Sequence, residues 1–292
     1  MPTLQECTLL KGVYEIKNIV KKGNLSVVYF AKNMITKELF IIKEFYPSEI
    51  AIRDTDNQTV LSRLPSNKAK FNQLKELFIQ EATILQNLNC QHVAKYIEHF
   101  EENGTIYITM EYFEGVPLDQ YVIENTNPTY VSIFLTLINT LNNVHQKGII
   151  HRDIKPSNIL IANDGTPCLI DFGSAIDYRV TKDTPILTSK NYSPLELYSN
   201  KSNQNVKTDI YSLSATIYYA ITKNPPHDIS ERLLDDRLLD IRDYNSNINY
   251  LLSRMIMWAL ALEQKKRCFS LKFIKIALLY EKIRLLKRRS EI

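Results

Sequence analysis

The stretch HRDIKPSNIL, residues 151–160, places three different polar groups in a short segment just ahead of apolar residues. Asp153 stands two places before Lys155 and five places before Asn158. A carboxylate can accept the proton of a hydroxyl group, a lysine can offset phosphate charge, and an amide oxygen can bind a metal ion. These are the groups that a hydroxyl needs around it if it is to attack a phosphorylated nucleotide held beside a metal ion.

The composition is that of an ordinary soluble protein. The chain has 292 residues, of which 45% are hydrophobic and 23% are charged, so it contains enough apolar material for a substantial core. Its net charge of +4 is a mild bias and does not amount to the footprint of a nucleic-acid-binding protein. We therefore expect no nucleic-acid partner.

The cysteines argue against disulfide bonds and zinc sites. Cys7, Cys90, Cys168 and Cys268 are scattered, with no C-x-x-C pair and no histidine spacing that suits zinc, which fits a reducing cytosol. The first residues lack the layout of a secretion signal, and no apolar run approaches the roughly 18 residues of a membrane span. We expect a soluble, cytoplasmic protein.

The first hundred or so residues predict strands interrupted by one strong helix. Turn-forming sequences separate four segments rich in β-branched or aromatic residues, at 14–20, 27–31, 39–45 and 105–112. They predict a small antiparallel sheet. Apolar residues recur at helical spacing from Phe71 to Leu88, which predicts an amphipathic helix packed on that sheet and ending near Asn89.

After Glu114 the pattern becomes mostly helical. Apolar residues recur three and four apart over residues 131–144, 209–222 and 250–262. Short β-like runs at 159–161 and 168–170 flank an Asn-Asp-Gly turn at 163–165, which is typical of a hairpin. The change near residue 114 predicts an N-terminal lobe of residues 1–113 and a C-terminal lobe of residues 114–292.

In the order of its motifs the chain resembles eukaryotic-type Ser/Thr protein kinases, and in particular a bacterial subset of them, from about Tyr14 to Leu279. The family signature requires a strand lysine, a helix glutamate, the H-R-D loop, a D-F-G triplet and a later glutamate, and all of them stand here in that order. The resemblance implies an α+β, bilobal protein-kinase-like fold. A small antiparallel-sheet lobe with one main helix would bind ATP, and a larger, mainly helical lobe would hold the catalytic groups and the protein substrate.

The strand sequence FIIK, residues 40–43, resembles the V-A-I-K of the family. The resemblance implies that Lys43 holds the α- and β-phosphates of ATP and that Glu81 orients the lysine. The two residues are 38 positions apart, about twice the separation in familiar kinases. The surplus, at about 46–70, resembles a connection of the bacterial subset, and we expect an extra loop or small ribbon that is tolerated as a surface insertion.

The nucleotide-covering loop departs furthest from the family. The pattern G-x-G-x-x-G-x-V falls on Lys21, Gly23, Ser26 and Val28, so one glycine of three remains. Because glycines let backbone N–H groups close over phosphates, we expect a stiffer or lifted loop, with Lys21 or Lys22 attracting phosphate instead. The residues that the resemblance implies for ATP binding are Val20, Lys21, Lys22, Gly23, Asn24, Leu25, Ser26, Val28, Lys43, Glu111, Phe113 and Leu160.

The resemblance also gives each polar group of the opening stretch a role. Asp153 would accept or orient the proton of the substrate hydroxyl, and Lys155 would offset charge on the γ-phosphoryl group. Asn158 and Asp171, the latter from the D-F-G triplet, would bind Mg²⁺. The implied catalytic residues are Asp153, Lys155, Lys43 and Glu81, the implied cofactors are ATP and Mg²⁺, and the implied substrate is a protein Ser or Thr hydroxyl in regulatory signalling.

Other motif residues would support or regulate this site. Glu196 would form a buried ion pair with Arg267, and Asp209 would brace the catalytic loop. Arg152 raises a switch hypothesis, because an arginine beside the catalytic aspartate can dock a phosphate carried by residues 174–192. The candidate positions are Thr181, Thr184, Thr188 and Ser189, of which Ser189 aligns with the position that faces the substrate hydroxyl.

Two other functions stay open. The glycine-poor loop, together with Ile41 at a site over the adenine that is usually small, favours a pseudokinase that binds nucleotide or partners without transfer. A small-molecule phosphotransferase would share the Asp and Asn groups, but it would lack the segment between D-F-G and Pro194 that is present here.

The C-terminus is basic and follows an apolar, helix-like pattern. A solvated final helix is the simplest interpretation, since cations suit the negative end of a helix dipole, and a membrane-surface or partner contact is the alternative. The cations are Lys282, Arg284, Lys287, Arg288 and Arg289. The sequence gives no indication of the oligomeric state.

Overall fold

The computed structural model describes residues 3–125, 130–179 and 185–290, with side chains as far as residue 288. The chain divides into two compact units. The first consists of Met1–Asn89 and Ala94–Phe113, and the second of Cys90–Val93 and Glu114–Ile292.

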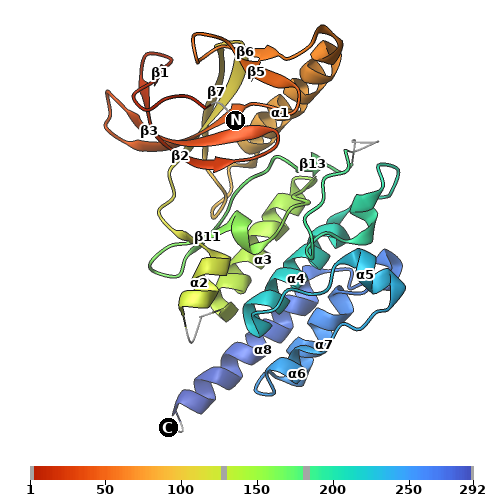
Figure 1. Cartoon of the computed structure of the whole chain (residues 1–292). Helices are drawn as coiled ribbons and strands as arrows, with labels where there is room; N and C mark the ends of the chain where they lie inside the picture. The colour runs from red at the N-terminus through yellow and green to blue at the C-terminus, as the bar shows by residue number, and fades with distance from the viewer. Residues whose placement is uncertain (1–2, 126–129, 180–184, 291–292) are drawn as a thin grey trace. The chain divides into compact units, whose positions relative to one another are not determined.

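A six-stranded antiparallel sheet dominates the first unit, with the strand order β1-β2-β3-β4-β8-β7 (Figure 1). Along β3, buried Val27, Tyr29 and Ala31 alternate with partly exposed residues, as expected where one face of a strand meets a core. The strands are β1 (Leu9–Leu10), β2 (Tyr14–Lys22), β3 (Ser26–Asn33), β4 (Leu39–Phe45), β7 (Tyr96–Glu102) and β8 (Thr105–Glu111). The predicted small sheet is present, with β1 and β7 in addition to the four strands that the sequence indicated.

One long helix, α1 (Lys68–Leu88), packs against this sheet. Its apolar face is aromatic near its start, where the rings of Phe71 and Phe78 lie 5.1 and 5.5 Å from the ring of Phe45 on β4. The helix ends where Asn89 adopts a left-handed conformation with φ of 31°. The predicted helix and its end near Asn89 are both present.

The residues between β4 and α1 form a two-stranded ribbon, β5 (Ala51–Arg53) paired with β6 (Val60–Ser62). A ribbon was expected here, but it is more than a tolerated surface insertion. The Arg53 guanidinium donates to the Glu44 carboxylate of β4 at 3.1 and 2.7 Å, and these side chains are only 1% and 0% exposed. The hydroxyls of Tyr29 and Tyr107 donate to the same carboxylate at 2.8 and 3.0 Å. A buried charged network therefore ties the ribbon to the sheet.

The regular secondary structure of the second unit is mainly helical (Figure 1). They are α2 (Leu118–Glu124), α3 (Tyr130–Gln146), α4 (Val206–Thr222), α5 (Ile229–Leu234), α6 (Ile241–Tyr244), α7 (Tyr250–Ala259) and α8 (Leu271–Ser290). Most of α4 is buried. It begins three residues before the predicted start, because Asn205 caps the first turn and its side chain accepts a 3.0 Å hydrogen bond from the Lys207 amide.

Two small antiparallel sheets support the loops of the second unit. One has the order β12-β11-β9, and the other pairs β10 with β13. The strands are β9 (Val116–Pro117), β10 (Ile149–Ile150), β11 (Ile159–Ile161), β12 (Pro167–Leu169) and β13 (Ile176–Asp177). The predicted hairpin joins β11 to β12, and Gly165 in its turn has φ of +83°.

The cysteines Cys7, Cys90, Cys168 and Cys268 are free thiols. Within the described ranges, no helix is both long enough and apolar enough to cross a membrane.

Candidate active site

In the first unit, Lys43 of β4 meets Glu81 of α1. The Lys43 ammonium donates to both carboxylate oxygens of Glu81, at 2.7 and 2.9 Å. The two residues are 7% and 3% exposed, so the ion pair is shielded from water. The structure therefore brings the predicted pair together despite the long insertion between them.

Strand register places two further predicted residues beside Lys43. Val28 of β3 stands opposite Lys43 of β4, and Lys21 of β2 stands opposite Val28. Residues directly opposite in an antiparallel pair lie on the same face of the sheet. Lys21, Val28 and Lys43 thus form a row across three strands, on the face to which Glu81 contributes its carboxylate.

The first residues of the insertion fix the loop between β2 and β3 through backbone hydrogen bonds. Gly23 closes the turn by donating its amide to the Ser26 carbonyl at 2.8 Å. At the tip, the carbonyls of Asn24 and Leu25 accept hydrogen bonds from the amides of Ser48 and Tyr46, both at 2.9 Å. Two carbonyls of the tip are therefore fixed, which is a physical reason for the stiffer loop expected of a glycine-poor sequence.

The other residues predicted for ATP binding are less buried. Val20, Lys22 and Glu111 of the first unit are exposed, and Phe113 is partly exposed. Glu111 forms an ion pair with Lys95 at the end of β8. Leu160 of β11, in the second unit, is also partly exposed.

In the second unit, Asp153, Lys155 and Ser189 form a triangle of hydrogen bonds. The Ser189 hydroxyl donates to Asp153 Oδ1 at 2.6 Å, and the Lys155 ammonium donates to Asp153 Oδ2 at 2.8 Å. The same ammonium donates to the Ser189 hydroxyl oxygen at 2.7 Å. A partly exposed carboxylate that already holds a hydroxyl beside a cation can orient a hydroxyl group and accept its proton.

Asn158 is fixed by Asp153 but has an unused oxygen. Its side-chain nitrogen donates to the carbonyl and to Oδ2 of Asp153, both at 2.9 Å. Its side-chain oxygen is buried and has no hydrogen-bond partner among the described residues. Buried polar atoms are nearly always paired, so an unpaired amide oxygen in this place indicates a ligand position.

Asp171 lies close to Asn158. The amide of Ile170, which precedes it, donates to the Asn158 carbonyl at 2.9 Å. Asp171 itself has φ of +63°, an uncommon conformation for a residue with a side chain and one often found at functional sites. One carboxylate and one amide oxygen fit Mg²⁺, because that ion usually takes few protein ligands and completes its shell with water and phosphate.

Asp209 braces the backbone of the loop at residues 151–160, as predicted. Its carboxylate is fully buried and accepts hydrogen bonds from the amides of His151 and Arg152, both at 2.8 Å. Nε2 of His145 lies 2.8 Å from the same carboxylate. Burial alone would raise the pKa of Asp209, but the contacts with His145 and these amides outweigh burial and lower it.

Arg152 is almost completely buried beside this brace. One of its terminal nitrogens donates to the Pro185 carbonyl at 2.7 Å, and its other two guanidinium nitrogens have no partner among the described residues. Burial lowers the pKa of Arg152 to about 10, against the attraction of Asp209. Two of the candidate phosphate positions, Thr181 and Thr184, lie outside the described residues, so the switch hypothesis stays a prediction.

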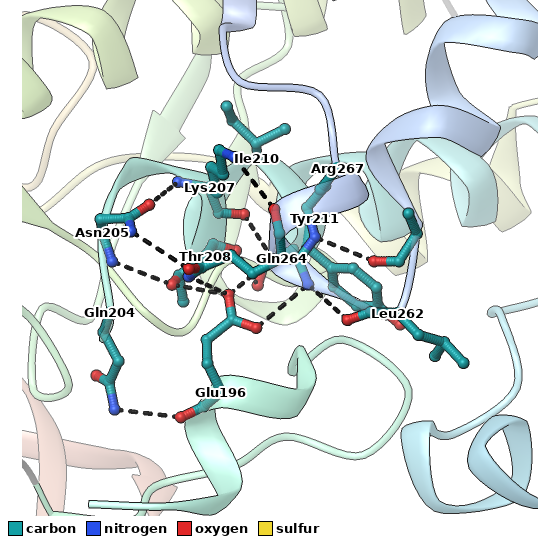
Figure 2. A network of polar contacts seen from close by, with 12 residues as sticks. Glu196, Gln204, Asn205, Lys207, Thr208, Ile210, Tyr211, Leu262, Gln264 and Arg267 are labelled. Atoms are coloured by element: carbon teal, nitrogen blue, oxygen red, sulfur yellow. Dashed lines mark hydrogen bonds and ion pairs between the residues drawn. The ribbon is translucent and has the colours of Figure 1, made fainter. Parts of the chain in front are cut away.

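The predicted ion pair between Glu196 and Arg267 is confirmed (Figure 2). The guanidinium donates to both carboxylate oxygens, at 2.7 and 3.2 Å. It also donates to the Leu262 carbonyl at 3.2 Å and lies 4.9 Å from the centre of the Tyr211 ring. With this many partners the pair is a structural support for residues 195–198, which follow the segment 174–192.

Comparison with protein families agrees with these motifs. The family model described as the protein kinase domain matches residues 14–275. The chain therefore belongs to the protein kinase domain family.

Several of the relatives are bacterial Ser/Thr kinases. Serine/threonine-protein kinase D of Synechocystis is 28% identical over 267 residues, which cover 87% of this chain and 49% of that protein. PrkC of Bacillus subtilis is 27% identical over 227 residues, which cover 75% of this chain and 32% of that protein. The predicted resemblance to a bacterial subset is confirmed, and the chain spans about half of the first relative and about a third of the second.

Solved structures confirm the predicted fold. PpkA-294 in its apo form has a TM-score of 0.81 at 26% identity, and the match covers 95% of this chain and 100% of that chain. The PknI kinase domain of Mycobacterium tuberculosis has a TM-score of 0.66 at 18% identity, over 96% of this chain and 99% of that chain, which is a likeness of fold alone.

Proposed function

We propose that this chain is a Ser/Thr protein kinase that transfers the γ-phosphoryl group of Mg-ATP to a Ser or Thr hydroxyl of another protein, in regulatory signalling. The observation that carries the proposal is the triangle of Asp153, Lys155 and Ser189, in which a carboxylate holds a hydroxyl at 2.6 Å beside an ammonium group. A substrate hydroxyl in the place of the Ser189 hydroxyl would find a proton acceptor and a cation within hydrogen-bond distance.

The second unit would supply the reacting groups. Asp153 orients the acceptor hydroxyl and takes its proton, while Lys155 offsets the negative charge on the group being transferred. Asn158 and Asp171 would hold Mg²⁺, and the unpaired Asn158 oxygen is available as one ligand. When bound, Mg²⁺ neutralises charge on the phosphate oxygens.

The first unit would supply the phosphate-binding cation. Lys43, held in place by Glu81, contacts the α- and β-phosphates, and Lys21 adds positive charge from the same face of the sheet. Apolar Val28 borders the lysine and would cover the nucleotide, together with the other residues that the family resemblance assigns to ATP. The loop at Gly23 then needs little glycine freedom, because the insertion already fixes its tip.

The polar groups required for transfer are all present, which favours an active kinase over a pseudokinase. A cytoplasmic location, where Mg-ATP is available and the free cysteines stay reduced, belongs to the same proposal.

The proposal is tested by incubating the purified chain with Mg-ATP and a generic protein substrate and identifying the modified residues by mass spectrometry. We expect phosphoserine or phosphothreonine with the wild type, and none with Asp171→Ala. ATP binding without any transfer, by a wild-type protein whose circular dichroism is that of a folded chain, would instead support the pseudokinase alternative.

A further inference from the structure

The last helix, α8, has two apolar faces. One of them packs into the second unit, where Leu271, Ile274, Ala277 and Leu278 are between 0% and 2% exposed. The other carries five large apolar side chains that are 42% to 58% exposed: Ile276, Leu279, Tyr280, Ile283 and Leu286. We call these five residues the outer stripe.

The outer stripe lies directly opposite the buried face. An α-helix turns about 100° per residue, so positions spaced by three, four and seven residues line up along its length. Residues 276, 279, 280, 283 and 286 form one such row, and residues 271, 274, 278 and 281 form another on the far side. From residue 282 to residue 288 no side chain is buried, and the last turns of α8 extend away from the other helices (Figure 1).

Positive charge is concentrated on the same helix. Within Leu271–Ser290 there are seven Lys and Arg residues and one glutamate, so the helix has a net charge of +6. The whole chain has a net charge of +4, which leaves −2 for all other residues together. The excess positive charge of the chain is therefore located on α8.

Within the part of the chain that the structure describes, neither α8 nor the two helices packed against it carries an exposed acid to balance this charge. The one acid of α8, Glu281, is completely buried and is paired with Arg284 and Asn249. The helices that pack against α8, which are α3 and α7, contain no Asp or Glu. By helical spacing, Lys275 and Lys282 flank the outer stripe on one side, Lys287 lies within its opposite edge, and Lys272 precedes it on the same face.

We propose that α8 binds the surface of an anionic lipid bilayer, with its axis in the plane of the interface. The outer stripe would enter the boundary between headgroups and acyl chains, and the flanking lysines would contact the negative headgroups. A straight apolar row between cations suits a flat, anionic, apolar layer. A second copy of the chain is a poor occupant, because it would bring another helix of +6 against the first.

This proposal is separate from the kinase proposal, because no residue of α8 belongs to the candidate active site.

The test is co-sedimentation of the purified full chain with vesicles. One set of vesicles contains equal parts of phosphatidylglycerol and phosphatidylcholine, and the other contains phosphatidylcholine alone. We expect binding to the anionic vesicles, at least tenfold weaker binding to the neutral ones, and a clear loss of binding at high salt, since surface charges are screened. Equal binding to both vesicle types, or no binding to either at low salt, overturns the proposal.

Variants assign the binding to α8. The double variant Lys282→Gln, Lys287→Gln should weaken vesicle binding about 25-fold, because each cation removed costs about fivefold in affinity. The double variant Ile276→Ser, Ile283→Ser should weaken vesicle binding about tenfold or more. The matched controls alter exposed residues elsewhere, Lys37→Gln with Lys201→Gln and Leu234→Ser with Leu239→Ser, and they should bind as the wild type does.

Two further outcomes would contradict the proposal. If the control variants lose as much binding as the α8 variants, the attraction is a general property of the protein surface. If light scattering shows a dimer that Ile276→Ser with Ile283→Ser disrupts, or an acidic protein binds in preference to vesicles, the outer stripe has a protein occupant. Unchanged circular dichroism and phosphate transfer in every variant exclude misfolding as the cause.

Discussion

The buried pair of Arg53 and Glu44 allows a quantitative prediction about the insertion. Arg53→Met removes the cation while keeping a side chain of similar length. Among the residues that the structure describes, the Glu44 carboxylate, which is 0% exposed, would then keep only the hydroxyls of Tyr29 and Tyr107 as partners. The ribbon would also lose the 2.7 Å hydrogen bond from Arg53 to the Gln58 carbonyl.

The expected cost is large. Removing one partner of a buried ion pair leaves an uncompensated charge and typically costs about 3–5 kcal/mol. The first unit should bear that loss, because all of these groups belong to it. Hydrogen exchange measured by mass spectrometry resolves the unit from the rest of the chain. Amides of β4 and β5 in Arg53→Met should exchange about 100-fold faster or more.

Two further variants make the test specific. Arg63→Met alters an exposed arginine of the same connection and should change exchange by less than about threefold. Glu44→Gln combined with Arg53→Met should be more stable than Arg53→Met alone, because a neutral glutamine can accept from one hydroxyl and donate to the other without a buried charge. The reasoning is refuted if Arg53→Met has no larger effect than Arg63→Met, or if the double variant is less stable than the single one.

Three other predictions concern the loop brace, a glycine and the substrate side of the site. Folding lowers the pKa of the Asp209 carboxyl, so the ionised carboxylate stabilises the protein at pH values above its unfolded pKa of about 3.9. That contribution is lost as the pH falls through the lower folded pKa. Asp209→Asn should therefore lower the free energy of unfolding in urea by about 2 kcal/mol at pH 7 and by less below about pH 4. Gly104→Ala should lower the free energy of unfolding, measured by thermal denaturation, by about 2 kcal/mol, because Gly104 has φ of +69° and a Cβ would lie 2.7 Å from the Val60 carbonyl oxygen. Gly12 has a similar φ of +68° but open space around it, so Gly12→Ala should cost about half as much. Ser189→Ala removes a hydroxyl that fixes the Asp153 carboxylate and the Lys155 ammonium before a substrate arrives, so kcat/KM for a protein substrate should fall about tenfold in steady-state kinetics while the KM for ATP stays the same.

The order of the kinase motifs along the chain was sufficient to predict which of their side chains contact each other. Lys43 and Glu81 were matched across 38 residues because a strand lysine and a helix glutamate have fixed places in the kinase signature. The contacts of Asp209 and of Glu196 with Arg267 followed from the same order. These residues are recognisable because the chemistry requires a particular side chain at each position.

Residues without such a requirement could not be found in advance. Strand β7 has no buried residue, since it lies at the edge of the sheet, and so it lacks the apolar alternation that marks a strand. Arg53 looks like any surface arginine until folding places it over Glu44. The bonds from Tyr46 and Ser48 to the loop at Gly23 are made by backbone amides, which leave no trace in the residue types.

The most direct test of the central claim is transfer of labelled phosphate from Mg-ATP to a protein substrate by the wild type and by Asp153→Asn. Asparagine has a similar shape but cannot accept the hydroxyl proton, so we expect label on Ser or Thr with the wild type and a loss of about 100-fold or more with the variant. Equal transfer by the two proteins, with both folded, would show that the loop at residues 151–160 does not perform the chemistry assigned to it.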